Sequence, residues 1–337
     1  MNINIRKIQG FVSQNAIYIV LAVLVIGIAI YNPNFIGINT FRDILVQSST
    51  RVIIALGVAF ILITGGTDLS AGRMVGLTAV ISASMLQVED YPRRFFPDLQ
   101  HLPLLVPILI AIVVGLIFGM INGIIVSKLK VPPFIATLGT MVAIYGINSL
   151  YFDTDPNQSQ PIGGLRDDFT RIGSGSIGSG DFKIPFIVLI AIAVSIIVWV
   201  LFNKTRLGKN MYAIGGNEQA ARVSGINVTK YLIIIYSIAG ALYGLAGVLE
   251  AARTGGATNN YGNMYELDAI AACVVGGVST TGGIGTVPGV MAGVLIFTVI
   301  NYGLTFIGVG PYWQLIIKGA IIVAAVAFDM RKYASKK

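Results

Sequence analysis

Long apolar runs, most of them close to the length that crosses a lipid bilayer, recur along nearly the whole chain. A transmembrane helix needs about 20 predominantly apolar residues. The clearest runs are residues 16–31, 104–126, 131–150, 184–202, 231–249, 287–306 and 312–328. Shorter or interrupted runs are residues 52–64, 74–88 and 269–278. The pattern predicts an all-α, polytopic integral membrane protein with about ten transmembrane helices.

The composition agrees with this fold class. Of 337 residues, 55% are hydrophobic and only 11% are charged, and a soluble domain of this length would need far more charge on its surface. The 40 glycines suit close helix packing and broken spans in a bilayer. We therefore expect one transmembrane domain over residues 1–337, with no second domain that folds alone.

The lysines and arginines are distributed unequally between the two sides that a ten-span topology defines. The richer side holds both termini and the polar stretch 203–226, and the positive-inside rule assigns that side to the cytoplasm. Residues 151–183, rich in Gly, Ser and Asp, then form a flexible or irregular loop on the outer side of the membrane. The net charge of +8 follows from this topology, so a nucleic-acid partner is not needed to explain it.

The stretch NKTRLGKNMYAIGGNEQAARVSGI, residues 203–226, is polar and basic although long apolar runs flank it. Asn217 is placed to cap a helix, Glu218 suits the positive end of its dipole, and Gly225 suits a left-handed C-terminal cap. This spacing predicts a short helix over about 218–224. Because so short a helix is unstable alone, we expect it to pack on the membrane domain or on a partner. The alternative is an ordinary polar loop that happens to carry capping residues.

The segment EQAARVSG, residues 218–225, is similar to the E-A-A-x-x-x-G coupling loop of bacterial ABC importer permeases, although Gln219 stands where alanine is usual. The similarity covers nearly the whole chain. The motifs that carry it are SSTRVIIALGVAFILITGGTDLSAGR (48–73), PFIATLGTMVAIYGINSLY (133–151), NKTRLGKNMYAIGGN (203–217), GATNN (256–260), YELDAIAACVVGGVS (265–279) and VINYGLT (299–305). The chain resembles the permeases of bacterial monosaccharide ABC importers, the ribose, xylose and galactose group, and most closely its galactose/methyl galactoside branch.

This resemblance implies a homodimeric channel in the lipid of the bacterial inner membrane, served by a cytoplasmic ABC ATPase and a periplasmic sugar-binding protein. The cargo that it implies is galactose or methyl galactoside, with ribose or another pentose as the alternative. Residues 203–230 would form the cytoplasmic coupling loop, and the outer loop 151–183 would be periplasmic. The residues expected to couple the permease to the ATPase are Asn217, Glu218, Ala220, Ala221, Arg222 and Gly225.

The chain lacks the phosphate-binding P-loop, G-x-x-x-x-G-K-[ST]. Gly208 and Lys209 have Asn203 where the first glycine belongs and Asn210 after the lysine. LSAGR, residues 69–73, resembles the ABC signature LSGGQ, but apolar spans flank it and no P-loop accompanies it. We therefore expect no ATP hydrolysis and no cofactor on this chain, because ATP is used by the partner.

Two other classes of function are weighed against a permease. An ion-coupled secondary sugar transporter would also be apolar and glycine-rich, but it would not need the segment 218–225. A membrane-embedded enzyme would need a cluster of catalytic carboxylates, histidines or metal ligands. The sequence shows no such cluster, so we expect neither a catalytic residue nor a metal site.

Two glycine-rich segments interrupt the apolar pattern in the two halves of the chain, GGTDLSAG (65–72) and VGGVSTTGGIGTVPG (275–289). Such breaks in both halves point to a transport pathway, whereas tight helix crossing through small residues is the alternative. Asp68 and Ser70 are placed to cap the following helix. For Asp68 we favour this capping role, with partial pairing to Arg73, over direct sugar contact, although its place makes it a functional candidate.

A neutral sugar needs amides, hydroxyls and aromatic faces along its route and no charged partner. Polar side chains in or beside the predicted spans supply such groups. Each of them, taken alone, equally fits a hydrogen bond between helices. As a set, the candidates for the translocation path are Asp68, Asn122, Asn148, Asn259, Asn260, Asn301 and Tyr302.

Overall fold

The structure of the protein is a computed structural model that describes residues 16–178 and 183–334. These residues are mostly helical, with one short antiparallel pair, β1 (Ser176–Ile177) and β2 (Ile184–Pro185). The chain ends, which the charge pattern assigns to the cytoplasm, and residues 179–182 of the expected periplasmic loop lie outside the described residues. The helices are α2 (Ala16–Tyr31), the 3₁₀ helix η1 (Pro33–Ile36), α3 (Ile38–Ile63), α4 (Ala71–Met85), α5 (Leu105–Ser127), α6 (Pro133–Phe152), α7 (Asp167–Ser174), α8 (Phe186–Lys204), α9 (Arg206–Gly216), α10 (Glu218–Val223), α11 (Val228–Thr254), α12 (Tyr265–Val275), α13 (Val287–Phe306) and α14 (Pro311–Ala334).

Every apolar run identified in the sequence coincides with a helix. In the described residues, six helices, α3, α5, α6, α8, α11 and α13, are long and apolar enough to cross a membrane. The chain is therefore a helical, polytopic membrane protein. α4 and α12, over two of the shorter runs, have only 15 and 11 residues.

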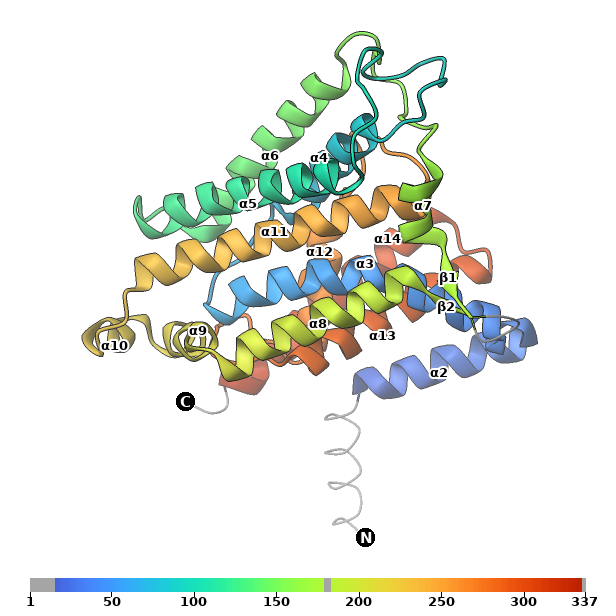
Figure 1. Ribbon diagram of the computed structural model, residues 1–337. Coiled ribbons are helices and arrows are strands. Elements are labelled where there is room, and N and C mark those ends of the chain that lie inside the picture. The colour runs from blue at the N-terminus through green and yellow to red at the C-terminus, as the bar shows by residue number, and fades with distance from the viewer. Residues whose placement is uncertain (1–15, 179–182, 335–337) are drawn as a thin grey trace.

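α11 is the central helix of the bundle and contacts α5, α4 and α3; in Figure 1, α5 and α4 lie above it and α3 lies below. Glycines make its contact with α5 very close: a Cβ on Gly115 or Gly240 would overlap the backbone of the opposite helix. Gly119 and Gly244 extend the same seam one turn along each helix. The sequence expectation that small residues bring helices together is confirmed here.

The short helices α4 and α12 begin side by side inside the bundle. Gly72, in the first turn of α4, packs so closely on Gly262 and Glu266 that a Cβ would overlap both. α4 follows the predicted break after Ile63, and α12 is followed by the second break before α13. The two breaks also meet, because a Cβ on Gly282 would lie only 2.9 Å from the Gly65 nitrogen, and the Gly283 N–H donates to the Ile63 carbonyl at the end of α3 at 2.8 Å.

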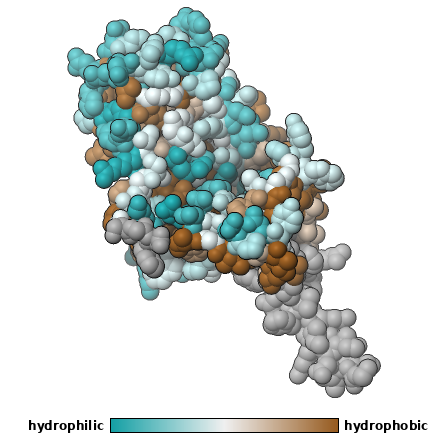
Figure 2. Space-filling model, turned by 90° about the vertical axis from the view of Figure 1, so that its right-hand side faces the viewer, coloured by the Kyte–Doolittle hydropathy of each residue, from teal (hydrophilic) through white to brown (hydrophobic). Residues whose placement is uncertain are grey.

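The bundle has two different ends (Figure 1). α9, α10 and the turn between α5 and α6 gather at the left in that view, whereas α7, β1 and β2 lie at the right. Figure 2 looks at the right-hand end and shows hydrophilic residues over most of its upper part and hydrophobic ones toward its lower edge. The arrangement separates the polar stretch 203–226 from the loop 151–183 along the helix axes, as the sequence predicts.

The expectation of a flexible or irregular loop over 151–183 is wrong for part of its described residues. α7 forms there, and Phe169 is fully buried against the end of α11 and its neighbours. Ile162 pairs with Ala257 in an antiparallel bridge, with both N–H groups donating at 2.9 Å. The glycine-rich composition gave no sign of this order, which comes from two apolar residues, Ile162 and Phe169, that pack on the larger domain.

Candidate coupling and translocation sites

The predicted short helix and both of its predicted caps are confirmed in α10. The Ala220 N–H donates to the Asn217 side chain at 2.9 Å, and Gly225 adopts a left-handed φ of +83°. Glu218 and Arg222, one turn apart, form an ion pair at 2.6 Å. These contacts order the helix within this chain, and a partner is not required for its caps.

The two alanines of α10 face opposite ways. Ala221 is buried against Ile214 of α9 and Val228 of α11, so it packs the helix on the membrane domain, one of the two places expected for it. Ala220 is exposed, and Val223 is 91% exposed although it is a large apolar side chain. The surface of α10 that a partner could contact therefore includes Ala220 and Val223, while Ala221 anchors the helix.

α9, which the sequence did not predict, connects α10 to the second glycine-rich break and to the end of α3, just before the first break. The Tyr212 hydroxyl donates to the Gly285 carbonyl at 2.7 Å, and burial raises the pKa of this phenol. Gly215 lies so close to the Ile63 carbonyl and the Gly283 N–H that a Cβ would overlap them. Thr205, whose hydroxyl caps the first turn of α9 at Gly208, is the sequence signal that could have revealed this helix.

Asp68, Ser70 and Asn122 are brought together at the start of α4. One Asp68 carboxylate oxygen accepts from the Ser70 N–H at 2.8 Å and from its hydroxyl at 2.6 Å. The Asn122 amide donates to the same hydroxyl at 2.9 Å. The predicted pairing with Arg73 is wrong, because Arg73 donates to Asn263 and stacks on Tyr145 instead. The predicted capping role is therefore divided: Asp68 accepts from the Ser70 N–H just before α4, whereas the Ser70 side chain caps no N–H group of the helix.

The remaining candidates fall into separate places. The Asn148 amide donates to the Asn259 carbonyl at 3.3 Å, joining α6 to the segment before α12, whereas Asn260 is exposed. Asn301 and Tyr302 are neighbours in sequence but line different pockets. The Tyr302 hydroxyl donates to Asp43 at 3.1 Å. The structure does not join all seven candidates in one continuous lining.

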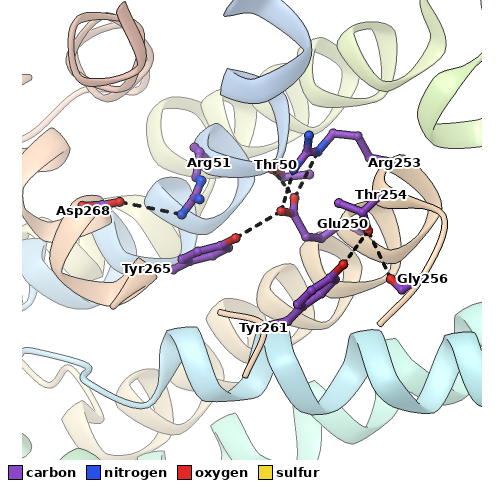
Figure 3. A network of polar contacts seen from close by, with 9 residues as sticks. All are labelled: Thr50, Arg51, Glu250, Arg253, Thr254, Gly256, Tyr261, Tyr265 and Asp268. Carbon is purple, nitrogen blue, oxygen red and sulfur yellow. Dashed lines mark hydrogen bonds and ion pairs between the residues drawn. The ribbon is translucent and has the colours of Figure 1, made fainter. Parts of the chain in front are cut away.

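A network of charged side chains that sequence reasoning missed links α3, α11 and α12 (Figure 3). Glu250 is buried and accepts hydrogen bonds from Thr50 at 3.0 Å, from Arg253 at 2.7 Å and from Tyr265 at 3.1 Å. The Arg51 guanidinium stacks 3.3 Å from the centre of the Tyr265 ring. These hydrogen bonds offset the free-energy cost of removing the Glu250 carboxylate from water.

The network continues to α14 through Asp268. This carboxylate accepts from the Lys318 ammonium at 3.1 Å and lies 3.9 Å from Arg51. Figure 3 shows Arg51 and Tyr265 between the two carboxylates, Glu250 and Asp268. The sequence did contain a signal for this network, because its ionisable residues lie next to or inside apolar runs. An ionisable residue in such a place is a candidate functional residue.

Arg51, Asp268 and Lys318 also line a cavity of about 110 Å³ between α3, α12, α13 and α14. Asn301 is the one predicted path residue that reaches it. The cavity wall mixes these polar groups with apolar side chains, which is the usual composition of a small-molecule site. Its remaining lining residues are Gln47, Ile54, Tyr265, Ala269, Ala272, Val294, Phe297 and Thr298.

Residues 40–326 match the family described as the branched-chain amino acid transport system, permease component. The chain belongs to this family of membrane permeases, as the helical bundle and its apolar spans indicate. It is 56% identical to the galactose/methyl galactoside import permease protein MglC of Haemophilus influenzae, over 98% of each chain.

Other relatives give the same class of protein. MglC of Escherichia coli is 53% identical over 99% of each chain. The ribose import permease protein RbsC of Bacillus subtilis is 39% identical over 97% of this chain and 95% of its own. No solved structure matches this chain. The resemblance found in the sequence motifs is confirmed.

Proposed function

We propose that this chain is the membrane permease of an ABC importer that carries galactose and methyl galactoside across the bacterial inner membrane. The observation that carries the proposal is that sequence identity is higher to the galactose/methyl galactoside permeases than to the ribose permease. Identity is 56% and 53% to two galactose/methyl galactoside permeases and 39% to a ribose permease, each over nearly the whole chain. A ribose or other pentose permease is the alternative.

The proposal includes partners and a topology. The permease crosses the membrane about ten times, has both termini in the cytoplasm and works as a homodimer. A periplasmic binding protein delivers the sugar at the end that holds α7. A cytoplasmic ATPase docks on α10 at the opposite end, and this docking is supported by the exposed, ordered surface around Ala220 and Val223.

A physical route for coupling accompanies this proposal. Movement of α10 reaches α9 through the packing of Ala221 on Ile214. α9 in turn contacts the second break and the end of α3, through Tyr212 and Gly215. Since the second break follows α12 and the first break joins the end of α3 to α4, ATP binding in the partner would shift these short helices and change which side of the membrane the path faces.

Uptake by cells tests the cargo. A strain that lacks this chain should fail to accumulate radiolabelled galactose at low external concentration, and should regain it when the chain is returned. Ribose uptake should be unaffected. Loss of ribose uptake with normal galactose uptake would favour the pentose alternative over the proposed cargo.

Hydrolysis measurements test the division of labour. The purified chain should hydrolyse no ATP above a contaminant control, because it lacks a P-loop, and activity should arise only in complex with the ATPase. Ala220→Arg should abolish that association, since it puts a bulky charge on the exposed face of α10. Ser174→Arg, at the opposite end of the bundle, is the matched control and should leave association intact.

A further inference from the structure

We propose that the cavity between α3, α12 and α13 is a binding site for a neutral monosaccharide on its way through the permease. The inference deepens the proposed function and rests on it. It assigns sugar contacts to Arg51, Asp268 and Asn301, of which the sequence singled out only Asn301. Neither the family match nor the names of the relatives bear on these positions.

Three helices each present one continuous stripe to this cavity. On α12 the lining residues are Tyr265, Asp268, Ala269 and Ala272, spaced as one face of a helix. On α13 the stripe from Val294 to Asn301 has the same spacing, and on α3 it runs from Gln47 to Ile54. The cavity therefore follows the helix faces, and Lys318 of α14 closes part of its wall.

The polar groups in the wall have unused hydrogen-bonding capacity. Arg51 has a buried guanidinium nitrogen, Nη1, that makes no hydrogen bond and whose ion-pair partner, Asp268, lies 3.9 Å away. Within the described residues, the Asp268 carboxylate accepts a hydrogen bond from Lys318 alone, and the Asn301 side-chain amide makes none. An unpaired buried donor costs about 1–3 kcal/mol. A ligand that pairs with it recovers this free energy.

The chemistry of the three groups matches adjacent sugar hydroxyls. Each hydroxyl both donates and accepts, and here a carboxylate accepts, a guanidinium donates and an amide does both. The apolar side chains of Ile54 and Phe297 in the same wall suit the C–H face of a pyranose ring. Asp268 lies beside both Arg51 and Lys318, so the cationic groups already have an anionic neighbour. The three charged side chains in the wall carry one net positive charge, so the choice of a neutral sugar rests on the proposed function.

A labelling experiment on the assembled transporter tests the assignment. Asn301→Cys is made with Cys273→Ala and reconstituted with the ATPase and the binding protein. Its reaction with a small thiol reagent is timed with and without galactose. At about ten times the half-saturating concentration, bound sugar should slow labelling about tenfold. Tyr302→Cys, the next residue in α13 but in a different pocket, should react at the same rate in both conditions.

The outcomes separate this inference from the proposed function. Failure of the unsubstituted complex to import galactose would contradict the proposed function. Import of galactose together with unprotected Asn301→Cys would mean that the cavity holds only water, and would overturn the site alone. Protection by galacturonate but not by galactose would show an anion site and would also overturn it.

As a second measurement, Asn301→Ala should lower kcat/KM for galactose uptake by about threefold to tenfold, the range expected for one lost hydrogen bond. Thr305→Val, which removes a hydroxyl one turn further along α13 that does not line the cavity, should change it less than about twofold. Equal effects of the two substitutions would contradict the assignment of Asn301.

Discussion

At the scale of single residues, Glu250 shows how an ionisable group is accommodated in this bundle. Its side chain is 3% exposed, and donors from α3, α11 and α12 surround it. Removing one member of a buried ion pair leaves the other charge uncompensated. The same two residue types also form a pair on α10, between Glu218 and Arg222, where the Glu218 side chain is 51% exposed.

This contrast predicts that Glu250→Gln lowers the free energy of unfolding by about 3–5 kcal/mol. Glu218→Gln should lower it by less than about 1 kcal/mol, because exposed pairs contribute little. Thermal unfolding of the purified proteins in detergent would show the difference as a much lower Tm for the first variant. Equal Tm values would mean that the network around Glu250 contributes no net stability.

Single residues also show which contacts can be predicted from the sequence and which cannot. Asn217 and Gly225 could be assigned from sequence because capping depends on neighbours along the chain. The partners of Asp68, Glu250 and Asp268 could not, because they come from other helices. A local rule joined Asp68 to Arg73, whereas Arg73 is held by Asn263 across the bundle.

At the scale of elements, helix positions were predictable and helix roles were less so. Apolar length placed a helix over each predicted run, but α3 begins at Ile38, well before residue 52. The predicted run starts only at residue 52 because Arg51, just before it, is charged. In the structure Arg51 lies within α3, where it contacts Tyr265 and Asp268. α7 and α9 were missed because a few apolar anchors order them, and those anchors matter only once the bundle exists.

Two adjacent glycines at the end of α9 should respond differently to substitution, because only Gly215 packs on Ile63 and Gly283. Gly215→Ala should push α9 away from Ile63, which costs about 1–3 kcal/mol as overpacking, and should reduce sugar uptake per ATP hydrolysed. Gly216→Ala should be tolerated, because a Cβ there meets nothing within 4 Å, and alanine favours the helix by up to about 1 kcal/mol.

Uptake and hydrolysis measured together on the same vesicles would compare these variants. If Gly215→Ala couples hydrolysis to uptake as well as Gly216→Ala does, the route through α9 is wrong.

At the scale of the whole molecule, the two ends of the bundle carry the asymmetry of an importer. One end holds α9 and α10, and the other holds α7 and the β1–β2 pair (Figure 1). Charge distribution in the sequence already predicted which end faces the cytoplasm. The cavity at the α3–α12–α13 contact could not be predicted, because it depends on how three stripes from distant segments meet.

Orientation is tested by cysteines at the two ends. With the buried Cys273 replaced by alanine, Lys209→Cys should react with an impermeant thiol reagent only from the cytoplasmic side. Ser174→Cys should react only from the periplasmic side. Reversed labelling would overturn the ten-span topology and, with it, the docking of an ATPase on α10.

The central claim, that this chain is the permease of an ATP-driven galactose importer, is tested most directly by reconstitution. Vesicles containing the chain and its ATPase, with binding protein outside and ATP inside, should accumulate radiolabelled galactose. Unlabelled methyl galactoside should compete with it, and ribose should compete far less. Galactose accumulation by the chain alone, driven by an ion gradient without the ATPase, would contradict the account.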